Sequence, residues 1–378
     1  MASTRVVILF LASLYSLVAH SSNNEALNAT LAYGYDTNPH RLSDALNPVE
    51  QQFAIADVRF SERFFKLISL RANASKSLYF DDRRADEFSG YASLALRSSF
   101  KLWREKFRYK LSANYRTKDK TYVSKTTGLV ATFGGQSIAD RYDSSQQNYL
   151  AAFSYEPNSY LDFEISYQYR AKEYQAFDIV GLSNLDYSHA RYVLGVEYRP
   201  SEVGKFFLDG TIKNRDYSDR RGKDLNNVDV LDTNLSFSYW LLDMGYVYRP
   251  SKKIIWKYTY NYEERRDNVS GYFNSTSGFI SISARHQVGD YQFWTGKIKY
   301  SKNSLINQTQ QSANPLDDEN KDKQGGFVRI GYELVLATLF DTNFAFYIDL
   351  EYRHFESSDP LFTYDSGIAS AGIRWSAF

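Results

Sequence analysis

Basic side chains recur at every second position in several segments of this 378-residue chain. Guanidinium and ammonium groups aligned along one surface attract anions, and a water-filled passage lined with them favours anion transit. At these alternate positions basic side chains outnumber acidic ones, although the whole chain is nearly balanced in charge, with 45 Lys and Arg against 44 Asp and Glu. The candidate residues are Arg59, Arg71, Arg97, Arg108, Arg116, Arg170, Arg191, Arg329 and Arg353, with Glu164, Asp349 and Glu351 as their acidic counterparts.

Catalytic chemistry has little support in the sequence. A hydrolase needs a His close to a Ser or an Asp pair, and no spacing marks His40, His189, His286 or His354 for that role. We therefore interpret these residues as solvated loop histidines. The chain has no Cys, which excludes disulfides and thiolate chemistry. The acidic run 317–320 lacks the ligand spacing of a Ca²⁺ loop, so we expect no enzymatic activity, no metal and no cofactor.

The same alternation defines the elements that carry the charged side chains. In 255–263, Trp256, Tyr258, Tyr260 and Tyr262 lie on one face of an extended segment, and polar residues lie on the other. A helix would spread both sets around its circumference, so the period of two predicts a strand. The pattern predicts about sixteen strands, with 14 to 18 as the range. Their segments are 28–36, 53–60, 68–75, 91–98, 107–116, 149–155, 161–170, 192–198, 206–213, 240–248, 255–263, 280–285, 294–300, 328–334, 344–353 and 369–376.

Short turns and long loops alternate between these strands. Turns with Pro, at 155–158, 198–201 and 248–251, follow even-numbered strands, and long polar loops such as 117–145 and 301–324 follow odd-numbered ones. This asymmetry is typical of outer-membrane barrels, which have short periplasmic turns and longer outer loops. A dry core cannot hold the charged strand faces, whereas a water-filled lumen can. We therefore predict an all-β fold, a transmembrane antiparallel up-and-down β-barrel.

In such a barrel the aromatic face of 255–263 contacts outer-membrane lipid, and the charged phase lines the lumen. The lumen charges then have two interpretations. They attract anions in transit, or they form a ladder of Arg–carboxylate pairs that solvates and stiffens the wall. Because Arg-lined walls are common in barrels of any function, the sequence favours the second interpretation.

The first 21 residues have the composition of a secretory signal peptide. Arg5 precedes a short apolar run at 6–19, and Ala19-His20-Ser21 fits a small-x-small cleavage site. About 14 apolar residues are too few to span a bilayer comfortably. We expect 1–21 to be a signal peptide and 22–378 to form a single barrel domain in the bacterial outer membrane.

The long segment 117–145 contains an apolar stretch at 127–135 that is unusual for a fully solvated loop. Two arrangements are open. The segment folds into the lumen as a constriction, or it extends a hairpin above the membrane.

Both ends of the chain resemble known outer-membrane proteins. The last segment, with Trp375 and Phe378, resembles the assembly signal of bacterial outer-membrane proteins, a terminal amphipathic strand that ends in Phe, although Phe378 here falls on the polar phase. Residues 33–41, Tyr-Gly-Tyr-Asp-Thr-Asn-Pro-His-Arg, are similar to the first-strand motif of β-barrel porin families associated with exopolysaccharide export loci. The resemblance implies the barrel-assembly machinery and periplasmic polysaccharide-export components as partners. The balanced charge gives no support for a nucleic-acid partner.

These observations predict an outer-membrane barrel and leave three functions open. The first is a channel for passage of saccharide or anionic polysaccharide across the outer membrane. The second is a passive diffusion porin for small solutes. The third is a non-conducting surface barrel with an adhesive or structural role.

Overall fold

The computed structural model describes residues 26–377 except 66, 104, 126, 308–321 and 340–341. The expected signal peptide at 1–21, the acidic run 317–320 and Phe378 therefore lie outside the described residues.

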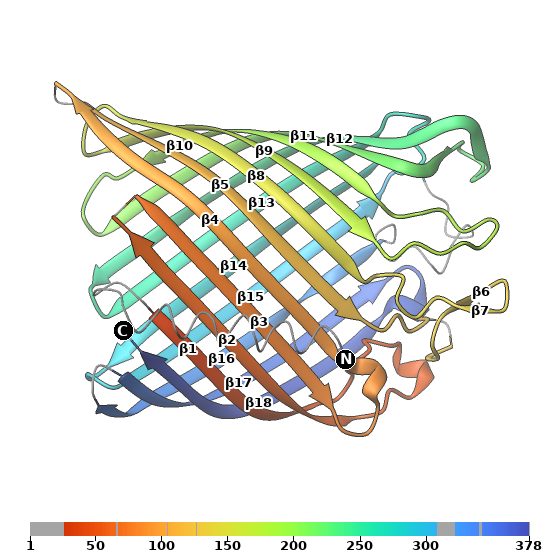
Figure 1. Cartoon of the computed structure of the whole chain (residues 1–378), viewed down its shortest axis with the longest axis horizontal. Coiled ribbons are helices and arrows are strands. Elements are labelled where there is room, and N and C mark those ends of the chain that lie inside the picture. The colour runs from red at the N-terminus through yellow and green to blue at the C-terminus, as the bar shows by residue number, and fades with distance from the viewer. Residues whose placement is uncertain are drawn as a thin grey trace.

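Sixteen long strands form a closed antiparallel barrel, as the sequence predicts (Figure 1). Each strand pairs with its neighbour in the barrel order, and β18 pairs with β1, which closes the sheet and removes its edges. The barrel strands are β1 (Ala26–Asp36), β2 (Gln51–Phe64), β3 (Ile68–Tyr79), β4 (Glu87–Leu102), β5 (Glu105–Lys120), β8 (Ser144–Glu156), β9 (Leu161–Tyr174), β10 (Tyr187–Tyr198), β11 (Gly204–Lys223), β12 (Asp229–Ser251), β13 (Ile254–Asp267), β14 (Ser275–Val288), β15 (Gln292–Leu305), β16 (Lys323–Leu339), β17 (Thr342–Ser357) and β18 (Tyr364–Ala377).

Every segment predicted from alternation lies within one of these strands, but the strands are longer than the segments. The difference is largest in β11 and β12, whose pairing continues past a register shift after Asp216 to Lys223 and Asp229. The outer part of β11 is mostly polar and is held by backbone hydrogen bonds. It therefore carries no alternation that a sequence pattern could detect.

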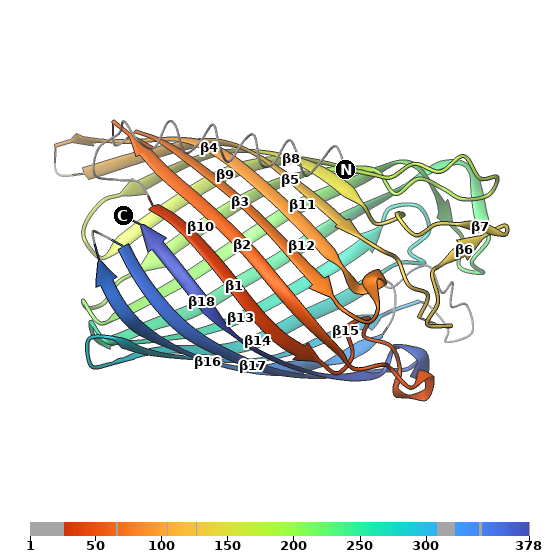
Figure 2. The ribbon, with the colours of Figure 1, turned by 60° about the horizontal axis from the view of Figure 1, so that its bottom comes forward.

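Short turns and long loops lie at opposite ends of the barrel (Figures 1 and 2). The β12–β13 turn, for example, is only 252–253, whereas the β5–β8 and β9–β10 connections span 121–143 and 175–186. In the described loops lie the short 3₁₀ helices η1 (Asp44–Leu46), η2 (Arg83–Ala85) and η4 (Pro360–Phe362). No helix in the described part of the chain is long and apolar enough to cross a membrane.

The 33–41 motif fastens the first strand to the last. The Asn38 side chain donates from Nδ2 to the carbonyl oxygens of Leu42 at 2.7 Å and Asp365 at 3.0 Å, and its Oδ1 accepts the Leu42 N–H at 2.8 Å. The Asn38 N–H donates to Asp36 Oδ1 at 2.9 Å. Because Asp365 belongs to β18, these bonds join the end of β1 and its loop to the closing strand. We call this network the seam clasp.

Candidate functional site

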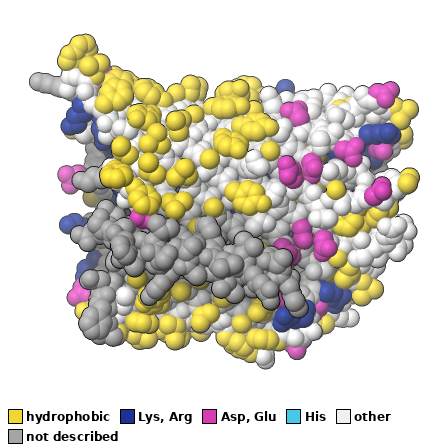
Figure 3. Space-filling model, viewed as in Figure 1, with side chains coloured by type: hydrophobic (Ala, Val, Ile, Leu, Met, Phe, Trp, Pro, Cys, Tyr) yellow, Lys and Arg dark blue, Asp and Glu magenta, His cyan; other side chains and the backbone are white. Residues whose placement is uncertain are grey.

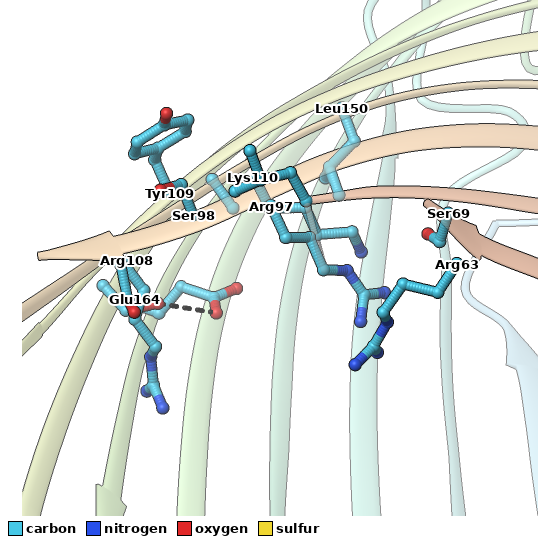
Figure 4. Close-up of a pocket in the computed structure, with 13 residues that line it drawn as sticks. Arg63, Ser69, Arg97, Ser98, Arg108, Tyr109, Lys110, Leu150 and Glu164 are labelled. Carbon is cyan, nitrogen blue, oxygen red and sulfur yellow. Dashed lines mark hydrogen bonds between the residues drawn. The ribbon is translucent and has the colours of Figure 1, made fainter. Parts of the chain in front are cut away.

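Alternate side chains of each strand face the lumen. On β5, Tyr109 and Leu111 are exposed on the outer surface, whereas Lys110 between them points with Arg97 of β4 into an inner recess. Figure 4 shows Tyr109 directed away from the other two side chains. Arg97 and Lys110 are direct cross-strand partners, so the pairing register carries this division from strand to strand.

The structure places all the charged residues that the sequence singled out in the inward phase. Arg191, for example, pairs across strands with Lys213, and Arg329 pairs with Glu351. The inward residues are Arg59, Arg71, Arg97, Arg108, Arg116, Arg170, Arg191, Arg329, Arg353, Glu164, Asp349 and Glu351.

Part of this set forms ion pairs, as expected of a ladder that stiffens the wall. The pairs are Arg59–Asp57 at 2.7 Å, Arg329–Asp349 at 2.8 Å, Arg108–Asp162 and Arg353–Glu351. In these pairs the carboxylate neutralises the basic group, so they contribute little to anion attraction.

The other part has no such neutralisation. Within the described residues, no carboxylate lies within ion-pair distance of Arg71, Arg97, Arg116, Arg170 or Arg191. The lumen therefore combines paired and unpaired arginines. A ladder of Arg–carboxylate pairs that stiffens the wall accounts only for the paired ones.

A recess of about 590 Å³ lies in the wall built by β2 to β9 (Figure 4). Arg63, Arg97, Arg108 and Lys110 line it, with Glu164 at one side accepting a hydrogen bond from the Ser154 hydroxyl at 3.3 Å. Like charges directly opposite each other across strands are destabilising. The Arg97–Lys110 pair thus favours an anion in the recess.

A second basic surface covers the inner face of β11 to β16, and we call it the cation–phenylalanine wall. Each of its four basic side chains lies near an inward Phe ring, and none has a carboxylate within ion-pair distance among the described residues. The pairs, with distances from the charged group to the ring centroid, are Lys257–Phe207 at 5.5 Å, Arg285–Phe293 at 5.0 Å, Lys297–Phe327 at 5.3 Å and Lys299–Phe279 at 4.1 Å.

Part of the inner face is apolar, which the sequence analysis missed. The β13–β14 loop packs Tyr272 and Phe273 against Leu235, Phe237 and Tyr239 on the inner face of β12, and all five are buried. This loop therefore folds into the loop end of the lumen. The signal was present in the sequence, because apolar residues at 235, 237 and 239 lie in the opposite phase to the membrane-facing residues 240–248.

The long 117–145 segment adopts the extended of the two expected arrangements. Its hairpin, β6 (Thr132–Phe133) and β7 (Gln136–Ser137), lies beyond the ends of the barrel strands (Figures 1 and 2). Its apolar residues are explained by a small core of Tyr122, Ala131 and Ile138, against which residues of the β9–β10 loop also pack.

The interpretation of the histidines as solvated loop residues is wrong in two respects. His189 and His40 are shielded from solvent, and His189, His286 and His354 lie in strands β10, β14 and β17 and not in loops. His189 lies in β10 and is only 5% exposed. The His40 side chain is only 8% exposed, with its Nε2 3.1 Å from Asp82 Oδ2, and desolvation lowers the pKa of His40 although Asp82 opposes the shift. His286 and His354 are exposed. Within the described residues, no group of three His, Asp or Glu side chains is arranged to hold a metal ion.

The outer surface is largely apolar around its middle, with charged side chains towards the ends (Figure 3). Trp256, Tyr258, Tyr260 and Tyr262 are on this outer face, each 38–40% exposed, and Trp375 lies in the outward phase of β18. An apolar exterior around a closed sheet with a charged interior satisfies the requirements of a bilayer. The chain is therefore a bacterial outer-membrane β-barrel.

No family model matches the chain, and no curated protein sequence matches it. Solved outer-membrane proteins have similar structures. OmpT of Vibrio cholerae without loop L8 is 14% identical, with 94% of this chain and 100% of that chain covered and a TM-score of 0.40. OccAB1 of Acinetobacter baumannii is 9% identical, with coverages of 94% and 97% and a TM-score of 0.44. A bacterial polysaccharide outer membrane secretin is 9% identical, with coverages of 95% and 99% and a TM-score of 0.42. At these values the similarities carry no argument about function.

Proposed function

We propose that the protein is a non-enzymatic outer-membrane channel for acidic saccharides, either oligosaccharides or an anionic polysaccharide. The observation that carries this proposal is the cation–phenylalanine wall, where lysines such as Lys297 and Lys299 face the lumen and no described carboxylate lies within ion-pair distance of them. Barrels with this number of strands leave an aqueous channel, and unpaired cations along it attract anions.

The Phe rings on this wall favour saccharides over simple inorganic anions. Phe207, Phe279, Phe293 and Phe327 face inward and are half-buried, so part of each ring is accessible from the lumen. The C–H faces of sugars pack on aromatic rings, while a carboxylate or other acidic substituent is attracted by the neighbouring cation. A surface that combines both groups suits an acidic sugar.

Periplasmic polysaccharide-export components and the barrel-assembly machinery are the partners of this proposal. The β4–β5 hairpin extends beyond the short-turn end of the barrel (Figure 1), where Trp103 is 89% exposed. Trp103 has a φ of 56°, which bulky residues rarely adopt, and the neighbouring turn presents Phe65 in the same way, 89% exposed with a φ of 51°. Two exposed, strained aromatic residues at the periplasmic end support a docking role.

The test is single-channel conductance of the purified barrel in a planar bilayer, with the anion-to-cation preference taken from the reversal potential. We expect an open, anion-preferring pore that acidic oligosaccharides block more strongly than neutral ones of equal length. The double variant Lys297→Gln/Lys299→Gln should lose part of both preferences. Lys252→Gln is the matched control, because Lys252 is exposed in the β12–β13 turn outside the lumen.

The other outcomes correspond to the other functions that the sequence leaves open. An open pore that acidic and neutral oligosaccharides block equally would replace this proposal with a passive diffusion porin. A barrel that never conducts would replace it with a surface barrel of adhesive or structural role.

A further inference from the structure

Four basic side chains meet on the inner face of β9, β10 and β11, near the loop end of the barrel. His189 pairs directly with Arg170 of β9 on one side and with Arg215 of β11 on the other, and Arg191 lies in the next inward position of β10. We call Arg170, His189, Arg191 and Arg215 the basic cluster. Like charges in direct cross-strand positions repel one another, so the cluster is costly by itself.

The cluster contains buried hydrogen-bond donors and acceptors that the protein does not satisfy. Nε of Arg170, Nε of Arg191 and Nδ1 of His189 are each buried without a hydrogen-bond partner. His189 as a whole is only 5% exposed. Buried polar groups are nearly always paired, and an unpaired one is costly. Three such atoms on adjacent strands indicate a ligand.

Among the described residues, no carboxylate lies within ion-pair distance of Arg170, His189 or Arg191, although Asp209 of β11 acts on Arg191 from further away. The charged groups that act most strongly on His189 are Arg170, Arg215, Lys213 and Arg191, all of them basic. A nearby carboxylate, Glu263, is already bonded to Lys213 at 3.3 Å.

Aromatic neighbours explain only one member of the cluster. The Arg215 guanidinium lies 4.5 Å from the Tyr187 ring centroid and 5.5 Å from that of Tyr239, which offsets part of its charge through cation–π contacts. The Arg191 guanidinium donates one bond to the Thr211 hydroxyl at 3.3 Å, but its Nε stays unpaired. A purely structural role therefore does not account for Arg170, His189 and Arg191 together.

We propose that the basic cluster binds a tetrahedral oxyanion, the phosphate or sulfate group of a solute in the lumen. Donors approach from three adjacent strands, which suits an anion with three or four oxygens better than a planar carboxylate with two. The inference rests on the proposed channel function and extends its substrate class to phosphorylated or sulfated saccharides. The cluster recognises this group whether a sugar carries it or it is free inorganic phosphate, because both present the same oxygens.

The experiment measures block of the chloride current through the bilayer-inserted barrel by inorganic phosphate, by glucose 6-phosphate and by glucose. We expect both phosphates to block and glucose not to block. Arg170→Gln should raise the half-blocking phosphate concentration at least about tenfold, the loss expected for one charge-assisted hydrogen bond. Arg191→Gln, a second variant, should do the same. Arg374→Gln is the matched control, because this inward arginine is already paired with Glu333.

Each outcome bears on a different conclusion. Block by inorganic phosphate alone identifies free phosphate as the ligand, and stronger block by glucose 6-phosphate identifies a phosphorylated sugar. Equal half-blocking concentrations in the parent, Arg170→Gln and Arg191→Gln proteins would overturn the site, even in an anion-preferring pore. A pore without anion preference would overturn the proposed function instead, and calorimetric titration of the solubilised barrel with phosphate would still test the cluster. The mobility shift of the folded barrel on gels of unheated detergent samples shows that each variant is assembled.

Discussion

Removing the Asn38 side chain should destabilise the barrel at its closing seam. Asn38 is 1% exposed, and its amide makes three hydrogen bonds, two to Leu42 and one to the Asp365 carbonyl. Asn38→Ala breaks all three and leaves the backbone groups of Leu42 and Asp365 without partners. At about 1 kcal/mol net for each bond, the expected loss is about 3 kcal/mol in the free energy of unfolding.

The assay is equilibrium unfolding in urea with the barrel in lipid vesicles, followed by Trp fluorescence and by the mobility shift of folded barrel on unheated gels. Asn38→Asp keeps the acceptor for the Leu42 N–H but places a buried carboxylate oxygen against the carbonyl oxygens of Leu42 and Asp365, so it should lose at least as much stability. Asn226→Ala is the matched control, since Asn226 is exposed and its hydrogen bonds within the described residues go to Asp224. A loss below about 1 kcal/mol for Asn38→Ala would show that water replaces the lost bonds and would refute the clasp.

Three further results are expected. Acidification from pH 7 to 5 should lower the hydrogen-exchange protection factors of the β1–β2 loop, taken relative to the intrinsic exchange rate at each pH. Burial lowers the pKa of His40 below 6.5, so the open form binds the proton first and the loop loses stability as the pH falls below that value; unchanged protection factors would contradict this. Burial raises the pKa of Asp143 to about 6, so the folded barrel loses stability as the pH rises from the ordinary pKa of an aspartate to about 6 and the carboxyl group ionises. Asp143→Asn should therefore raise the melting temperature at pH 8 but not at pH 4; equal gains at both pH values would refute the electrostatic cause. Phe273→Ser should increase single-channel conductance by loosening the β13–β14 loop, whereas deletion of 129–135 should leave the conductance unchanged. The reverse pattern would show that the β5–β8 loop, and not the β13–β14 loop, narrows the lumen.

The sequence by itself determined the strands and their two faces. Side chains alternate across a strand whatever lies beside it, so the contrast between Lys257 and its neighbours Trp256 and Tyr258 assigns inside and outside from a single segment. Turn and loop lengths are also local properties, and they indicated the two ends of the barrel. The outer end of β11 was missed because its side chains are mostly polar. The start of β12 was missed because Leu235, Phe237 and Tyr239 alternate in the opposite phase to the outward residues of 240–248.

Only the tertiary structure decided which charges are free and which loop enters the lumen. Whether Arg329 meets Asp349, or Arg170 lies opposite His189 and Asn148, depends on the register between strands, which alternation leaves open. Asn38 reaches Asp365 only after β18 closes on β1, a contact between residues 327 positions apart. His189 looked like a loop residue because its burial comes from neighbouring strands and not from its own segment. Local periodicity therefore determined the wall of this barrel, and closure determined the chemistry inside it.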